Sequence, residues 1–149
     1  MSEERVLSFY NPHYKEDLHT VYYRNGEYIP DSLKEINHIF RDHYNGRVKN
    51  IDLKLIDLLY AIRKNLNSTK PFHIISGYRT KKTNSYLSTF KGGVSKKSLH
   101  IKGMAVDLRM PGFQLRDLRR AAYELKEGGV GYYPKSNFVH VDVGSVRYW

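Results

Sequence analysis

The sequence predicts a single α+β domain in which a small antiparallel sheet packs against helices. Three observations lead to this prediction. The 149 residues, 40% of them hydrophobic, are enough for one core and too few for two domains. Apolar residues recur at helical spacing between residues 30 and 66. Short β-rich runs bounded by Gly or Pro dominate after residue 71. No repeat or linker divides the chain, so we treat residues 1–149 as one domain.

The first thirty residues are rich in tyrosine and histidine. Asn25-Gly26 lies between β-forming residues, which predicts a type I′ turn and a hairpin over residues 19–29. We expect residues 1–30 to form a hairpin or flap at the edge of the domain, with aromatic side chains that pack over the core.

Two helices follow and serve as scaffold. The first is expected from Pro30 to a stop at Asn45-Gly46, and the second begins after Asp52, a favourable N-cap. The wide apolar face of the second helix, over residues 55–66, indicates burial against a sheet. The later elements are expected, in order, as a strand at 71–76, a helix at 83–90, a basic solvated loop at 91–97, a strand at 104–108, a helix at 113–127 that ends at Gly128-Gly129, and strands at 130–133 and 138–143.

Three possible metal ligands stand out in the second half. His100 and Asp107 lie seven positions apart across Gly103, and His140 lies in the strand FVHVD. Side chains alternate along a strand, so Asp107 and His140 each point away from the apolar face of their own strand. If the two strands are antiparallel neighbours, these side chains converge, and Gly103 lets the chain bring His100 back to them.

Two histidines and a carboxylate with an open position are typical of a catalytic zinc. Such a zinc lowers the pKa of bound water to about 7 and polarises a carbonyl, which suits amide hydrolysis. Arg79, at the exit of its strand, is a candidate for holding a substrate carboxylate or stabilising an oxyanion. Asp142 is a candidate either for orienting His140 or for acting as a general base.

Each of these residues also has a structural interpretation. A lone histidine in an apolar strand is usually a hydrogen-bonded core residue, and Arg79 alone is most often an ion-pair residue. Asp107, between Val106 and Leu108, needs a partner if it is buried. The remaining histidines have no carboxylate at ligand spacing, and we assign them no metal.

Composition excludes several classes of function. The sequence contains no cysteine, which removes thiol catalysis, disulfides and cysteine-bound zinc. No window is long and apolar enough to span a membrane, and the first residues lack the apolar segment of a signal peptide. The net charge of +10 favours an anionic partner, either nucleic acid or an acidic cell-wall polymer. No zinc-finger, RNA-recognition or KH signature accompanies the charge, so we do not expect nucleic-acid binding.

Four segments together resemble a known family. They are ISGYRT at 75–80, SLHIKGMAVD at 98–107, GGVGYY at 128–133 and FVHVDVG at 138–144, followed by VRYW at 146–149. They are similar to the YcbK/MepK branch of murein endopeptidases, within the zinc D-Ala-D-Ala peptidase superfamily that includes the hedgehog signalling domain.

The resemblance implies a zinc metallopeptidase of the periplasm or cell wall that cuts stem-peptide cross-links of peptidoglycan. It implies one zinc per chain on His100, Asp107 and His140, with Arg79 near the substrate, and we expect Tyr78 and Ser98 beside Arg79 as substrate-binding residues. We expect a monomer. Several superfamily members carry a glutamate or histidine two or three residues before the last ligand, where this chain has Phe138 and Asn137; Asp142 is our candidate base in their place. The alternative is a zinc-bearing module that binds cell-wall peptides without cutting them.

Overall fold

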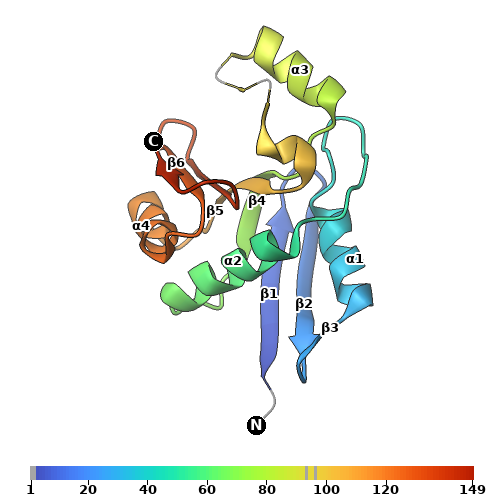
Figure 1. The fold of residues 1–149 in the computed structure, drawn as a ribbon, viewed down its shortest axis with the longest axis vertical. Coiled ribbons are helices and arrows are strands. Elements are labelled where there is room, and N and C mark those ends of the chain that lie inside the picture. The colour runs from blue at the N-terminus through green and yellow to red at the C-terminus, as the bar shows by residue number, and fades with distance from the viewer. Residues whose placement is uncertain (1–2, 93, 96) are drawn as a thin grey trace.

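Eight strands of the computed structural model form one sheet in the order β3-β2-β1-β4-β5-β7-β6-β8 (Figure 1). Neighbouring strands are antiparallel except β1 with β4 and β6 with β8. The structure describes residues 3–92, 94–95 and 97–149; Gly93 and Lys96 of the expected basic loop lie outside the described residues. The strands are β1 (Glu4–Asn11), β2 (Glu16–Arg24), β3 (Glu27–Tyr28), β4 (Phe72–Ser76), β5 (Ala105–Arg109), β6 (Gly129–Tyr133), β7 (Phe138–Asp142) and β8 (Arg147–Tyr148).

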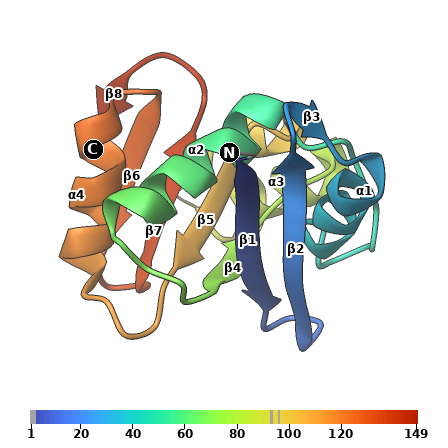
Figure 2. The same cartoon turned by 90° about the horizontal axis from the view of Figure 1, so that it is seen from below.

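Four α-helices and one 3₁₀ helix complete the described part of the domain. They are α1 (Pro30–Ile39), α2 (Leu53–Asn65), α3 (Lys81–Phe90), the 3₁₀ helix η1 (Leu99–Lys102) and α4 (Leu115–Leu125). In Figure 2, α2 crosses the near face of the sheet with α4 and α1 on either side of it. The buried side chains of α1, α2 and α4 form one hydrophobic core with the strands. The predicted α+β class is confirmed. None of the described helices is long and apolar enough to cross a membrane.

The N-terminal residues extend the sheet, which the sequence interpretation did not foresee. Asn25 and Gly26 both have positive φ, at 54° and 81°, as a type I′ turn between β2 and β3 requires. However, β2 also pairs along its whole length with β1, a strand that we did not predict. Leu7 and Phe9 of β1 are buried in the core. Three of the eight described strands, β1 to β3, are therefore built from residues that we expected to form a flap.

Both scaffold helices begin where the sequence predicts, at Pro30 and after Asp52, but the first ends earlier than predicted. Asp52 caps α2 as expected, because its Oδ1 accepts a 2.8 Å hydrogen bond from the Lys54 backbone N–H. The first helix ends at Ile39, well before the predicted stop at Asn45-Gly46. The chain leaves the helix there because the buried Asp42 carboxylate accepts from the backbone N–H of Tyr44 and holds a tight loop.

The sheet has one apolar face and one face that carries polar side chains. Val106 and Val141 are completely buried in the core. Asp107 and His140 point to the opposite face, where β5 and β7 pair antiparallel with these two residues directly across from each other. The predicted pairing of the two ligand-bearing strands is therefore confirmed. The register places both side chains at one spot on the sheet.

Candidate metal centre

The short helix η1 brings His100 over the two strand residues. The Ser98 hydroxyl accepts a 3.1 Å hydrogen bond from the His100 backbone N–H and so caps the helix. At the other end Gly103 adopts φ of 68°, and a Cβ there would lie 2.8 Å from the Asn50 carbonyl oxygen. Glycine is thus required for both conformation and space. This compact turn leads the chain straight from His100 into β5.

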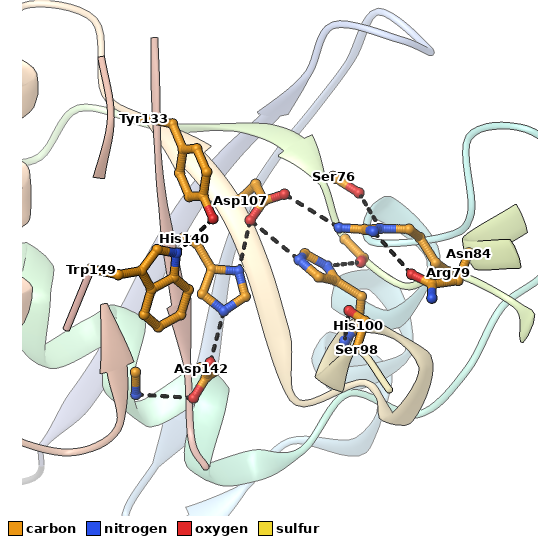
Figure 3. Close-up of polar contacts among 12 residues, drawn as sticks. Ser76, Arg79, Asn84, Ser98, His100, Asp107, Tyr133, His140, Asp142 and Trp149 are labelled. Carbon is orange, nitrogen blue, oxygen red and sulfur yellow. Dashed lines mark hydrogen bonds and ion pairs between the residues drawn. The ribbon is translucent and has the colours of Figure 1, made fainter. Parts of the chain in front are cut away.

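The three candidate ligands meet around one carboxylate oxygen (Figure 3). His140 Nδ1 lies 2.9 Å from Asp107 Oδ1, and His100 Nε2 lies 3.2 Å from the same oxygen. One ligand atom from each residue lies within 4.8 Å of the other two. Among the described residues, this is the one group of three or more His, Asp, Glu or Cys side chains with such an arrangement.

Hydrogen bonds on the far side of each ring fix which imidazole nitrogen carries a proton. His100 Nδ1 lies 2.8 Å from the Gly77 carbonyl oxygen, which can only accept, so Nδ1 carries the hydrogen. His140 Nε2 lies 2.7 Å from Asp142 Oδ2, and this carboxylate likewise accepts. In the neutral form of each ring, the nitrogen that faces Asp107 therefore presents a lone pair.

The charges of the site follow from burial and from these contacts. Burial lowers the pKa of His100 below its usual value, despite the neighbouring Asp107, so the ring is neutral at pH 7. Burial raises the pKa of Asp107, but the two imidazoles outweigh it and hold the pKa well below its usual range. For His140, burial lowers the pKa, but hydrogen bonds to Asp107 and Asp142 reverse the direction and raise it.

A divalent cation would resolve a conflict in this arrangement. A neutral His100 directs the lone pair of Nε2 at a carboxylate oxygen 3.2 Å away, so two acceptors face each other. A metal ion bound by both atoms would turn this repulsion into coordination. Two imidazole nitrogens and one carboxylate oxygen are the donor set of catalytic zinc sites that keep an open position. The residues present thus fit zinc.

Asp142 contacts the His140 ring on the side opposite Asp107. Its carboxylate is fully buried and accepts hydrogen bonds from the backbone N–H groups of Gly129 and Gly144, both at 2.9 Å. Arg147 adds two further contacts, at 3.1 Å and 2.9 Å. These hydrogen bonds and His140 together hold the pKa of Asp142 well below its usual range, against the effect of burial. Of the two roles that the sequence left open for Asp142, these contacts favour orienting His140 over acting as a base.

Arg79 is buried and all three of its nitrogens are engaged. Nη2 lies 3.4 Å from Asp107 Oδ2, while Nε donates to Ser76 Oγ and Nη1 to Asn84 Oδ1, both at 3.1 Å. Burial lowers the pKa of Arg79, but an arginine remains charged at any ordinary pH. The guanidinium thus holds the second oxygen of Asp107, so that Oδ1 faces the histidines.

Two glycines of β6 make room for C-terminal side chains beside the centre. Gly129 and Gly131 of β6 lie on the same face as His140, where a Cβ on Gly129 would lie 2.6 Å from Arg147 and one on Gly131 would lie 2.6 Å from the indole of Trp149. The missing side chains make room for Arg147 against Asp142 and for Trp149 beside the His140 ring, at 5.2 Å between centroids. The glycines of the motif GGVGYY therefore determine which side chains surround Asp142 and His140.

A cavity of about 320 Å³ opens over the three candidate ligands. Ser98, Arg79, Tyr133 and Trp149 belong to its wall together with the ligands. A larger hollow of about 800 Å³ lies beside α3 and the loop at residues 44–48, but it contains none of the three ligands. The smaller cavity is the candidate active site because the three candidate metal ligands line it.

Tyr78 does not line this cavity. Its backbone N–H donates to the Phe40 carbonyl at 2.8 Å, and its side chain lines the larger hollow instead. Of the residues expected beside Arg79 at the substrate, the structure brings Ser98 to the ligands and places Tyr78 elsewhere.

The sequence interpretation assigned no role to Tyr133, Asn84, Arg147 or Trp149, although all of them except Asn84 stand in a quoted motif. Trp149 Nε1 donates a 2.6 Å hydrogen bond to the Tyr133 hydroxyl oxygen within the cavity wall. The only signal available was the glycine spacing before Tyr133, because glycines that alternate in a strand mark a close approach of other groups.

Comparison with known proteins identifies the family of this chain. The family model described as peptidoglycan L,D-endopeptidase MepK matches residues 1–149. Peptidoglycan L,D-endopeptidase MepK of Escherichia coli (strain K12) is 43% identical over 145 residues, which cover 97% of this chain and 80% of the relative. A protein of Haemophilus influenzae described as a probable peptidoglycan L,D-endopeptidase MepK is 38% identical over 146 residues, or 97% of this chain and 78% of the relative. No solved structure matches significantly. The chain therefore belongs to the MepK family of M15 peptidases.

Proposed function

We propose that the chain is a zinc-dependent peptidoglycan L,D-endopeptidase that hydrolyses amide bonds in stem-peptide cross-links. One observation carries the proposal: two imidazole nitrogens, each freed by a hydrogen bond on the far side of its ring, face a single carboxylate oxygen at 2.9 Å and 3.2 Å. The relatives named as L,D-endopeptidases supply the substrate class and the bond type.

His100, Asp107 and His140 would hold one zinc ion. When bound there, zinc lowers the pKa of a water molecule to about 7 and polarises a carbonyl oxygen. The chain's own residues keep the ligands in place. Gly77 and Asp142 accept the outer N–H of each imidazole, and these contacts fix both rings.

The cavity wall suits an acidic peptide. Its described lining has three cationic side chains, Lys97, Arg79 and Arg147, and two carboxylates, each paired with one of the arginines, so one positive charge is in excess. Stem peptides of peptidoglycan carry carboxylates, and cationic side chains in a partly enclosed site attract them. The net charge of +10 favours the same polymer at longer range.

Acting on peptidoglycan would place the protein outside the cytoplasmic membrane, in the periplasm or cell wall. All three candidate ligands come from one chain, so we propose that a monomer is sufficient for activity. Asn137 and Phe138 offer no carboxylate or imidazole where several members of the superfamily have one, and the base therefore has no assigned residue.

Purified chain with one equivalent of zinc should be incubated with two cross-linked muropeptide dimers, one joined by an L,D bond and one by a D,D bond. Mass spectrometry should show cleavage of the L,D dimer, loss of cleavage with a chelator and recovery with added zinc. The variant H140A should be inactive, whereas H19A, which alters an exposed histidine in β2, should match the unsubstituted chain. Zinc-dependent binding of the dimer without cleavage would instead establish a binding module and refute the proposed activity.

A further inference from the structure

We propose that the Tyr133 hydroxyl donates a hydrogen bond to the oxygen of the scissile carbonyl and stabilises the negative charge that develops there. In this proposal Trp149 is the positioning residue that aims the hydroxyl. The proposal rests on the peptidase function proposed above and adds a protein donor to the same carbonyl oxygen that a bound zinc would polarise.

Tyr133 lies in the wall of the cavity that contains the three candidate ligands. It follows Gly129 and Gly131 on the ligand-bearing face of β6 and pairs with Phe138 of β7, two residues from His140. Figure 3 shows its ring on the same side of the sheet as Asp107 and His140, with the hydroxyl directed toward Trp149 and the histidine. The proposal places the substrate carbonyl in this cavity, between the candidate ligands and the hydroxyl.

The hydrogen bond from Trp149 determines where the tyrosine proton can go. Trp149 Nε1 can only donate, so at 2.6 Å the Tyr133 oxygen is the acceptor. The hydroxyl hydrogen must therefore point to another partner. Within the described part of the chain, no acceptor for this hydrogen lies within hydrogen-bonding distance. The donor is thus available to a ligand, and its oxygen is polarised by the indole N–H.

Tyr133 is also held in place from both sides. Its ring stacks on Phe138 with 4.6 Å between centroids and 17° between planes. The indole that contacts its oxygen fills the space left by Gly131, where a Cβ would lie 2.6 Å from the ring. A donor fixed in this way needs little reorganisation when charge develops.

Arg79 is less suited to this task. Its three nitrogens already donate to Ser76, Asn84 and Asp107. One N–H on each η nitrogen remains, but the side chain is only 7% exposed and these three contacts hold it in place. Tyr133 offers a hydroxyl hydrogen with no acceptor among the described residues, because its oxygen already accepts from Trp149.

The chemistry requires no proton transfer from Tyr133. As the oxygen of water bonds to the carbonyl carbon, the π bond of the carbonyl breaks and its electron pair moves onto the carbonyl oxygen. The O–H of Tyr133 strengthens its hydrogen bond to that oxygen while the proton stays on the tyrosine. When the tetrahedral species collapses, the electron pair re-forms the carbonyl and the C–N bond breaks. The proton that the attacking water gives up ends on the nitrogen, so a neutral amine leaves. The donor therefore acts mainly on kcat, because the interaction is stronger in the transition state than in the bound substrate.

The test compares Y133F with Y132F, which removes the same atom from the neighbouring residue on the opposite face of β6. Both variants are measured with zinc on the L,D-linked dimer, with zinc content and circular dichroism as controls for metal loading and folding. We expect Y133F to lower kcat by about 100-fold, as loss of one oxyanion donor does, with KM changed less than threefold. Y132F should retain kcat.

Two further readouts separate positioning from structure. Trp149 is the only tryptophan, so Y133F, which removes its acceptor, should shift the fluorescence emission, and Y132F should not. W149F should lower kcat by about tenfold, less than Y133F, because the donor remains but is no longer aimed.

Three results would overturn the proposal. They are a kcat of Y133F within threefold of Y132F, an effect of Y133F on KM alone, and a W149F loss as large as that of Y133F with reduced zinc content. Failure of the unsubstituted chain to cleave any dimer would refute the peptidase function and this inference together, whereas full activity of Y133F would refute only the inference.

Discussion

Replacing Asp142 with asparagine should weaken zinc binding by reversing the tautomer of His140. The carboxylate accepts at every contact: Oδ1 faces the backbone N–H groups of Gly129 and Gly144 and one Arg147 nitrogen, and Oδ2 faces His140 Nε2 and the other Arg147 nitrogen. In D142N one oxygen becomes an NH₂ donor. Fewer donors surround Oδ2, so the amide nitrogen should occupy that position and point at the His140 ring.

The consequence reaches the metal through the imidazole. With a donor at 2.7 Å, His140 Nε2 must accept, and the ring hydrogen moves to Nδ1. Nδ1 is the atom that faces Asp107 Oδ1 at 2.9 Å, so it no longer presents the lone pair that zinc needs. Zinc binding then requires the ring to return to the less favourable tautomer. Loss of such an outer partner typically lowers metal affinity 10- to 100-fold, which corresponds to about 1.4 to 2.7 kcal/mol.

Competition with a chromophoric zinc chelator measures this change directly. D117N is the matched control, because it makes the same substitution at a partly exposed carboxylate in the first turn of α4, remote from the centre. We expect D117N to bind zinc as tightly as the unsubstituted chain. Circular dichroism should show that both variants fold.

The alternative role for Asp142 predicts a different pattern. A general base is needed for turnover but not for holding the metal, so D142N would then bind zinc normally and lose nearly all of its kcat. Unchanged zinc affinity in D142N would therefore refute the tautomer argument. A shared loss of affinity and turnover, with turnover partly recovered at saturating zinc, is the result that we expect.

Three further predictions concern stability and the cavity wall. Zinc at 100 times its Kd should stabilise the fold by about 2.7 kcal/mol, which is a rise of about 5 to 10 °C in Tm by scanning calorimetry, and H140A should abolish the rise. Burial raises the pKa of Asp42, but hydrogen bonds such as the one from the Thr80 backbone N–H at 3.0 Å lower the pKa overall. The stability that the ionised Asp42 contributes is therefore complete above the unfolded pKa of about 3.9 and is lost as pH falls through the folded pKa. The difference in unfolding free energy between the unsubstituted chain and D42N should accordingly shrink below about pH 4. G131A places a methyl group where the Trp149 ring lies and should displace it, with a red-shifted emission and a kcat close to that of W149F; an unchanged emission would contradict the proposed packing.

Local patterns predicted much of the fold because the information that they carry is local. Asp52 as a cap, the Asn25-Gly26 turn and the alternation in β5 and β7 each depend on residues within a few positions. The errors lay where distant groups decide. The first helix ends early because the Asp42 carboxylate, buried against the rest of the fold, holds the next turn of chain in a loop. The strand β1 was missed because its partners, β2 and β4, include one that is more than 60 residues away.

The sequence by itself identified the three candidate ligands, since their residue types and their places on strand faces are fixed by local chemistry. Their meeting at one oxygen depended on the register of Asp107 against His140, which only the folded sheet specifies. Tertiary structure alone showed the hydrogen bonds that select one nitrogen of each imidazole and the indole that holds the Tyr133 hydroxyl. The physical reason is that a hydrogen bond depends on distances of a few tenths of an ångström between residues far apart in the chain. Residue spacing along a sequence does not determine such distances, whereas the packing of β6, β7 and β8 does.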